Sequence, residues 1–218
     1  MNNVYENNMK IHPLLPFFEK NKKILISILI SIILVISYFV INNQLTNKKN
    51  VEASIIYTSF LEELSSDDPD LDLINEDLNN LLETYGNLGY SQIALLNKAS
   101  FDANNNNFEE SLNNFQKLVN ITDGLKGNKI YNKIARVSAA RILLSEKKYD
   151  EALNMIEVFS SEPSNAYIHE LTGDILLKQN KTDLSLAQYE IALEKYNDEI
   201  SKTIISMKIA NIGGQVEK

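Results

Sequence analysis

The sequence predicts an all-α protein in which one N-terminal transmembrane helix precedes a stack of about four helix pairs and a C-terminal capping helix. Three observations lead to this prediction. A long apolar stretch without charges lies near the N-terminus, and the rest of the chain shows helical spacing of apolar residues between short polar turns. Only 7 Gly and 4 Pro interrupt the 218 residues, which favours helices over the many turns of a β-sandwich.

The apolar stretch runs from Ile24 to Ile41 as ILISILISIILVISYFVI and contains no charged residue. At about 1.5 Å per residue it forms roughly 27 Å of helix, enough to cross a bilayer. A cleaved signal peptide would be shorter and followed by small residues, whereas Asn42 follows here. We therefore expect an uncleaved anchor at 24–41. Ser27 and Ser31 either contact another transmembrane helix or bond back to their own helix.

The distribution of lysines predicts the orientation of this anchor. Four Lys precede it and two follow soon after, which places the N-terminus in the cytoplasm and the remainder in the periplasm of a bacterial inner membrane. The predicted organisation is a cytoplasmic segment 1–23, the anchor 24–41, a linker 42–50, a periplasmic repeat domain 51–212 and a frayed tail 213–218. An alternative topology keeps the repeats cytosolic, as in an organelle import receptor with an N-terminal anchor.

Composition excludes several classes of function. The net charge is -8, and the part after the anchor is more acidic than the part before it, so nucleic acid is not an expected partner. The chain has no Cys and only two His, His12 and His169, which we expect to be ordinary surface or packing residues. No phosphate-binding or hydrolase motif occurs. We therefore expect no enzymatic activity, no metal and no cofactor.

The region after the anchor contains a repeating helix pair. The two clearest copies, about 133–161 and 166–197, superpose at an offset of 33, so that Ala140 matches Gly173 and Ala152 matches Ser185. Small residues at these positions let two helices approach closely, while larger apolar residues fill the space between pairs. This pattern resembles the tetratricopeptide repeat.

Further helices complete the predicted array. A weaker copy covers 91–120 at an offset of 41, which implies an insertion around Asp123 to Asn132, and its Asn run 104–107 is predicted to be a turn. The segments 51–65 and 71–84, separated by SSDDPD, are predicted to form a degenerate first pair. The stretch 199–212 is predicted to cap the last pair.

In such arrays the first helix of each pair lines a concave face, where a peptide or a partner helix can bind. The inward positions combine apolar and charged residues, so pockets would receive apolar side chains while charges set orientation. A structural alternative is that Arg141 and Asp174, at equivalent positions, pair with each other. The predicted partner-binding residues are Ile93, Leu96, Ile134, Val137, Arg141, Tyr167, Glu170 and Asp174.

The whole arrangement resembles the YfgM-type ancillary subunit of the bacterial SecYEG translocon. The segments that carry the resemblance are FFEKNKK, TYGNLGYSQIALLNKA, ARVSAARILLSEKKYDEAL, ELTGDILLKQNKTDLSLAQYEIAL and SMKIANI. The resemblance implies a non-catalytic inner-membrane protein beside the translocon, associated with periplasmic chaperones and exported polypeptides. A second hypothesis is a structural scaffold in which the repeats self-associate or organise a complex.

Overall fold

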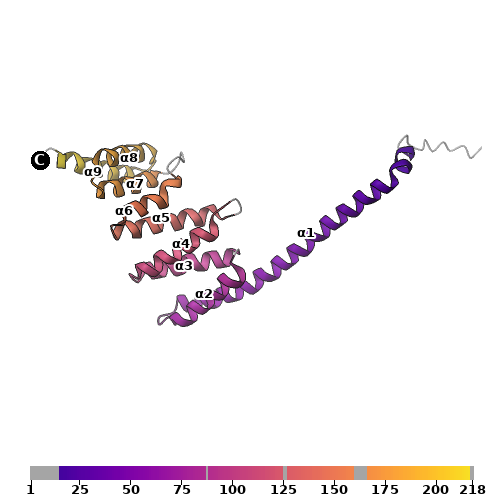
Figure 1. Cartoon of the computed structure of the whole chain (residues 1–218). Helices are drawn as coiled ribbons and strands as arrows, with labels where there is room; N and C mark the ends of the chain where they lie inside the picture. The colour runs from indigo at the N-terminus through magenta and orange to yellow at the C-terminus, as the bar shows by residue number, and fades with distance from the viewer. Residues whose placement is uncertain (1–14, 87, 125–126, 160–165, 217–218) are drawn as a thin grey trace, which may run out of the picture. The chain divides into compact units, whose positions relative to one another are not determined.

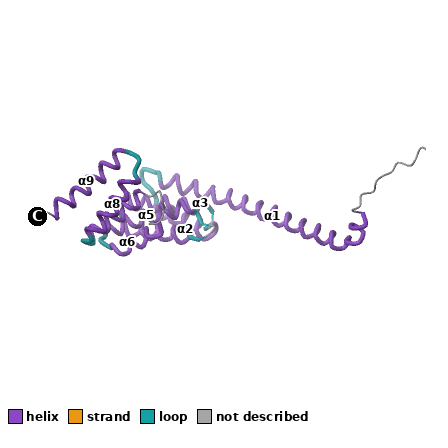
Figure 2. The backbone as a smooth tube through the Cα atoms, turned by 90° about the horizontal axis from the view of Figure 1, so that it is seen from above, coloured by secondary structure: helices purple, strands orange, loops and turns teal. Residues whose placement is uncertain are grey.

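The computed structural model describes residues 15–86, 88–124, 127–159 and 166–216, and these residues form helices without any strand (Figure 1, Figure 2). This confirms the all-α prediction. Most of the predicted cytoplasmic segment, including His12, lies outside the described residues. The helices are α1 (Leu15–Leu64), α2 (Leu71–Tyr85), α3 (Gly89–Asn104), α4 (Phe108–Thr122), α5 (Lys129–Ser145), α6 (Tyr149–Ile156), the 3-10 helix η1 (Glu157–Phe159), α7 (Ala166–Lys178), α8 (Thr182–Lys195) and α9 (Glu199–Val216).

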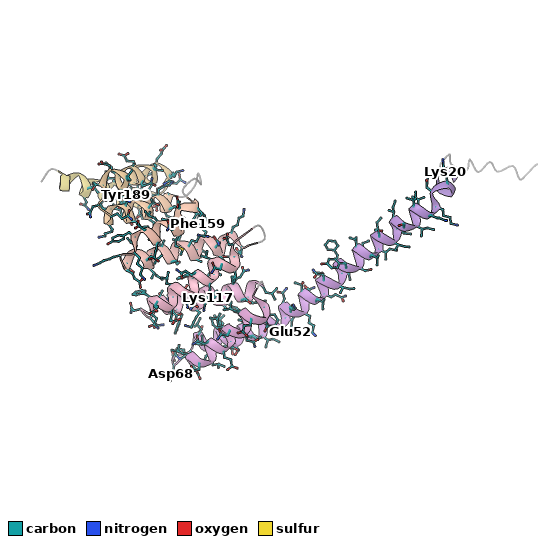
Figure 3. All side chains as sticks on the ribbon, viewed as in Figure 1. Lys20, Glu52, Asp68, Lys117, Phe159 and Tyr189 are labelled. Carbon is teal, nitrogen blue, oxygen red and sulfur yellow. The ribbon has the colours of Figure 1, made fainter. Side chains whose placement is uncertain are left out.

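Helix α1 contains the apolar stretch and is long and apolar enough to cross a membrane. The apolar side chains of the stretch 24–41 project from all sides of the helix and are not buried (Figure 3). The predicted linker 42–50 is helical as well, because it contains neither Gly nor Pro. Within it, the Thr46 hydroxyl donates to the Asn42 carbonyl at 2.9 Å. The Ser31 hydroxyl donates to the Ser27 carbonyl at 2.9 Å, so this serine bonds back to its own helix.

The chain divides into two compact units, residues 1–52 and 53–218, and the second contains the stacked helices. Its buried apolar residues form three clusters that follow one another along the chain. Phe60, Leu81 and Leu118 belong to the first cluster, Leu143 and Ile168 to the second, and Tyr189 and Ile205 to the third. Each helix pair thus covers the apolar face of the next, as expected for an α-solenoid.

Small residues let the two helices of a pair approach closely. The Ser111 hydroxyl of α4 donates to the Ala99 carbonyl of α3 at 2.7 Å, and the Ser185 hydroxyl of α8 donates to the Gly173 carbonyl of α7 at 2.8 Å. A Cβ atom on Gly173 would lie 2.6 Å from the ring of Tyr189, which is itself buried. The matching positions in successive copies therefore share one structural role.

The turns inside the pairs repeat in the same register as the helices. Asn106, Lys147 and Asn180 have φ of 62°, 65° and 61°, and they occupy equivalent positions of the three copies. After each of these residues, a backbone N–H bonds back to the carbonyl five positions earlier, for example Lys181 N to Leu176 O at 2.9 Å. This is the hydrogen bond of a Schellman helix end, and it confirms the predicted turn at 104–107.

The ends of the array differ in detail from the sequence expectation. Asp70, the last residue of the predicted SSDDPD turn, caps α2 by accepting from Asp72 N and Leu73 N. Helix α9 continues to Val216, whereas the sequence predicts a frayed tail from residue 213. Two Gly within that stretch cost about 1 kcal/mol each relative to Ala, but neither removes a backbone donor as Pro would. Residues 217–218 lie outside the described residues.

We predict that Gly173→Ala lowers the free energy of unfolding by about 1–3 kcal/mol, because the added methyl group overpacks the contact with Tyr189. The measurement is thermal unfolding of the full chain in detergent, followed by circular dichroism. Gly89→Ala is the matched control, since a Cβ there meets nothing within 4 Å. Equal stability of the two variants would contradict the close helix contact.

Candidate partner-binding groove

The first helices of successive pairs lie next to one another, because α3 contacts α5 and α5 contacts α7. All eight predicted partner-binding residues lie on these three helices. We call the surface that they define the groove face. It comprises Ile93 and Leu96 on α3, Ile134, Val137 and Arg141 on α5, and Tyr167, Glu170 and Asp174 on α7.

These residues differ in how much surface they offer. Ile134 is 41% exposed and Arg141 is exposed, whereas Ile93, Leu96 and Tyr167 are half-buried. Val137 is only 8% exposed and belongs to the core cluster shared by α5, α6 and α7. Val137 therefore contributes mainly to packing, and the accessible apolar surface is concentrated at Ile134.

A hollow of about 630 Å³ lies beside Ile134 and brings it together with Tyr167 of the next first helix. Ile130 and Val158, on the same hollow, are 71% and 54% exposed. The remaining lining residues are Thr122, Asp123, Gly124, Lys129, Asn132, Lys133 and Phe159. Large apolar side chains thus line a concavity instead of packing into the core.

Two aromatic rings in this hollow are held by one lysine. The Lys133 ammonium lies 5.3 Å from the ring centre of Phe159 and 5.6 Å from that of Tyr167. Such cation–π contacts contribute about 0.5–1 kcal/mol at exposed sites. They help to fix the rings in place, so the hollow has preformed walls.

Sequence reasoning missed Ile130, Val158 and Phe159 as groove residues. Ile130 lies within the predicted insertion, which was left out of the repeat comparison, and Val158 and Phe159 lie in η1 at the end of a pair. The available signal was Ile130 itself. A large apolar residue in the first turn of a helix, where the backbone is solvated, does not serve core packing and so indicates a contact surface.

The repeat register identifies one further apolar position. Ile93, Ile134 and Tyr167 are equivalent in the three copies, and the next equivalent position is Ile200 on α9. Ile200 is 77% exposed. Equivalent positions of four helices thus carry a row of apolar side chains, and extending the register to α9 would have found the fourth member.

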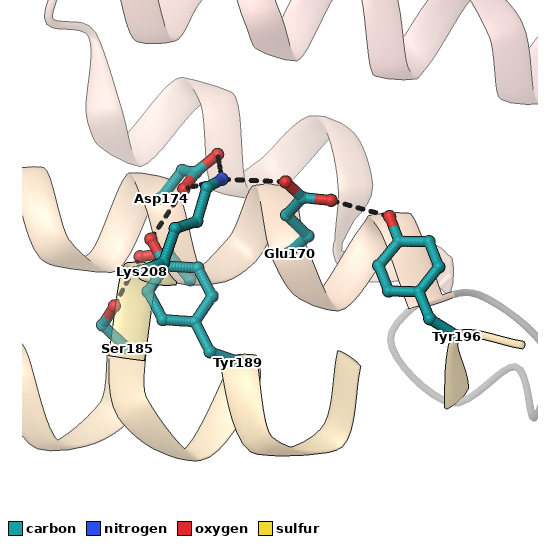
Figure 4. Close-up of polar contacts among 7 residues, drawn as sticks. Glu170, Asp174, Ser185, Tyr189, Tyr196 and Lys208 are labelled. Atoms are coloured by element: carbon teal, nitrogen blue, oxygen red, sulfur yellow. Dashed lines mark hydrogen bonds and ion pairs between the residues drawn. The ribbon is translucent and has the colours of Figure 1, made fainter. Parts of the chain in front are cut away.

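Glu170 and Asp174 are bound within the chain by α9 (Figure 4). The Lys208 ammonium lies 2.8 Å from Glu170 Oε1, and 2.7 and 2.8 Å from the two carboxylate oxygens of Asp174. The hydroxyl of Tyr196 donates to Glu170 at 2.6 Å, and that of Tyr189 donates to Asp174 at 2.6 Å. Asp174 therefore pairs with Lys208 instead of forming the alternative pair with Arg141.

Burial and charge act against each other on the pKa values in this network. Burial alone would raise the pKa of Glu170, but hydrogen bonds from Lys208 and Tyr196 outweigh it and lower that pKa. Burial alone would lower the pKa of Lys208, but the hydrogen bonds to Asp174 and Glu170 raise it. For Tyr189 and Tyr196, burial and the carboxylate acceptors both raise the pKa. The network thus favours charged Lys208 and Glu170 with neutral tyrosines.

Other polar groups do not form a reaction site within the described residues. His169 is buried, and its Nδ1 lies 2.8 Å from Gln188 Oε1, as expected for a packing histidine. In the described part of the chain, no group of three or more His, Asp or Glu side chains is arranged to hold a metal ion. The groove face offers surface for contact with a partner, and its two carboxylates are held by Lys208 and by the tyrosines of α8 and the residue after it.

The stacked helix pairs and the groove face define an α-solenoid of the protein-interaction class. The model of the family described as tetratricopeptide repeat-like domain matches residues 16–214, and the chain belongs to this family. A solved structure described as MamA RS-1 ArsTM double mutant has the same fold, with a TM-score of 0.52 and 14% identity over 76% of this chain and 97% of that chain.

Two curated proteins are similar to the chain in sequence. The ancillary SecYEG translocon subunit of Neisseria gonorrhoeae (strain ATCC 700825 / FA 1090) is 27% identical over 183 residues, which cover 81% of this chain and 82% of that protein. The beta-barrel assembly-enhancing protease of Yersinia pestis is 35% identical over 78 residues, 35% of this chain. The match spans only 15% of that protease. Together the comparisons point to a non-catalytic interaction module.

We predict that Lys208→Met lowers the free energy of unfolding by about 1–3 kcal/mol at neutral pH, because Glu170 and Asp174 lose a charged partner while half-buried. Chemical denaturation of the full chain in detergent measures this loss. Lys202→Met on the same helix is the control, since its 3.4 Å pair with Glu199 is exposed at the glutamate. Equal effects of the two variants would contradict the role assigned to Lys208.

The same network predicts how stability depends on pH. Because the pKa of Glu170 is lowered in the folded chain, its charged carboxylate stabilises the fold at pH values above the usual carboxylate pKa. This contribution is lost as the pH falls through the lowered pKa. The raised pKa of Lys208 stabilises the fold below 10.5, and that contribution is lost as pH rises through the raised value. We predict that Lys208→Met makes the free energy of unfolding depend less steeply on pH, both at acidic pH, where Glu170 titrates, and at alkaline pH, where Lys208 titrates. An unchanged pH dependence would contradict the network.

Proposed function

We propose that the chain is a non-enzymatic, membrane-tethered interaction module whose groove face binds apolar segments of partner polypeptides at the SecYEG translocon. The observation that carries the proposal is the hollow beside Ile134, where apolar side chains are exposed on a preformed concave surface. A buried apolar anchor in such a pocket is the usual centre of a binding interface.

The form of the apolar surface favours a polypeptide over a small molecule. The hollow opens to solvent at Ile130 and Ile134, which are both exposed. The row of equivalent apolar positions extends beyond it, from α3 to α9. A surface that crosses several helices fits an extended or helical segment, which places side chains along its length. A small ligand would fill only the part between α5 and α7.

Charge provides a further reason for a polypeptide partner. The chain has a net charge of -8, yet on the groove face Lys208 and the exposed Arg141 together balance the two negative charges of Glu170 and Asp174. The groove face is therefore less acidic than the rest of the domain. Apolar segments, including those that carry an acidic residue, can approach it without the repulsion expected elsewhere.

The similarity to an ancillary SecYEG translocon subunit, over most of both chains, supports the translocon as the place of action. In this proposal, α1 anchors the chain in the bacterial inner membrane through residues 24–41. The N-terminus lies in the cytoplasm and the repeats lie in the periplasm. The partners are SecYEG, periplasmic chaperones and the exported polypeptides that they receive.

We predict that a photo-crosslinking amino acid at Ile134 of the full chain, in bacterial membranes, captures translocon subunits, periplasmic chaperones or exported polypeptides. Mass spectrometry of the adducts identifies them. The control is the same probe at Glu190, an exposed residue of α8. Adding Tyr167→Ala to the Ile134 probe should reduce the adduct yield several-fold, because the aromatic wall is removed. Identical adducts at both probe positions would contradict binding in the hollow.

A reporter fused after Lys218 tests the topology. Alkaline phosphatase, which is active only after export, is expected to be active in this fusion, because four lysines precede the anchor and only two, Lys48 and Lys49, follow soon after it. The matched control replaces Lys20, Lys22 and Lys23 with Gln, which should reduce the exported fraction. An inactive phosphatase, together with an active cytoplasmic reporter at the same site, would exclude a periplasmic repeat domain.

A further inference from the structure

Helix α9 begins 33 residues after α7 and so occupies the place of the first helix of one more pair. Its first residue, Glu199, is the counterpart of Ala166 at the start of α7, and its Ser206 is the counterpart of Gly173. In the α7/α8 pair, this position contacts the second helix through Ser185 and Tyr189. Gly173 is buried, whereas Ser206 is exposed. The face that a second helix would contact is therefore open.

The two sides of α9 differ in burial. Ile205 and Ile212 are 0% and 4% exposed and belong to the core cluster that contains Tyr189 of α8. On another side, Ile200 and Met207 are 77% and 60% exposed, and Ile204 is 46% exposed. The counterpart of Ile204 in α7, Leu171, is only 5% exposed. The apolar side chains at 200, 204 and 207 are thus not explained by packing within the chain.

The spacing of these residues is that of a helix–helix seam. Ile200, Ile204, Met207 and Asn211 follow one another at alternating steps of four, three and four, the alternation of a coiled coil. Among the exposed residues beside them on the same open side, Thr203, Ser206 and Ala210 are uncharged, and Glu199 at the start of the helix is charged. The open face therefore combines an apolar row with small neighbours that let another helix approach closely.

We propose that this face, Ile200, Ile204, Met207 and Asn211, pairs with the same face of a second copy of the chain in an antiparallel arrangement. The spacing 4-3-4 reads the same in both directions, so two antiparallel copies place Ile204 of each opposite Met207 of the other. Such self-complementarity is what an interface with two-fold symmetry requires.

Charge also favours a second copy at this face. Two copies that each carry a net charge of -8 repel one another, and the repulsion is smallest where the contact surface has no charge. The four residues of the face meet this condition, and an antiparallel arrangement keeps the exposed Glu199 of one copy at the opposite end of the contact from that of the other. Lys208 ties α9 to Glu170 and Asp174 of α7, so the helix is held in place before it pairs. Pairing would cover Ile200 and leave Ile93, Ile134 and Tyr167 for other partners.

The absence of cysteine from the chain permits a direct test. Met207→Cys is introduced into the full chain in native membranes and treated with a short thiol–thiol crosslinker. We expect a product of twice the 24.7 kDa chain mass. Glu190→Cys, at an exposed position of α8, is the control and should give little of this product.

A second substitution separates pairing through α9 from pairing through any other part of the chain. Ile204→Lys in the Met207→Cys background places like charges across the proposed contact and should reduce the crosslinked product at least tenfold. Because Ile204 is 46% exposed, the circular dichroism spectrum should be unchanged. Equal crosslinking at positions 190 and 207, a yield unaffected by Ile204→Lys, or adducts only with other proteins would overturn the proposal.

Discussion

The close approach of the two helices in each pair is the constraint on which the rest of the structure depends. At Gly173 the ring of Tyr189 lies so near the backbone that a single methyl group would collide with it. This contact sets the distance between α7 and α8 and lets the Ser185 hydroxyl reach the Gly173 carbonyl. The groove face follows from it, because the first helices lie side by side only if each second helix packs closely behind its partner.

Much of the fold could be predicted because it depends on a local pattern. Small residues at 140, 152, 173 and 185, and an Asn run at 104–107, carry enough information to place the helix pairs and their turns. The family match over residues 16–214 agrees with this reading. The helix through 42–50 was not predicted, because polar residues after an anchor suggest a linker although nothing in them breaks a helix.

The groove was predicted less completely, because its properties depend on contacts between residues far apart in the chain. The inward positions of α3, α5 and α7 follow from the register, but Lys208 reaches Glu170 and Asp174 from a separate helix beyond α8. The hollow combines an insertion, a 3-10 helix and two first helices. No periodic pattern contains that combination, so the residues that shape the hollow could be identified only from the structure.

The central claim is that the helix pairs form one stack held together by their shared apolar faces. Hydrogen–deuterium exchange of the full chain in detergent tests it most directly. The account predicts that the buried amides of α3 to α8 exchange slowly and lose protection together as denaturant is added. Helices that lose protection independently, each at the rate of an isolated helix, would contradict it.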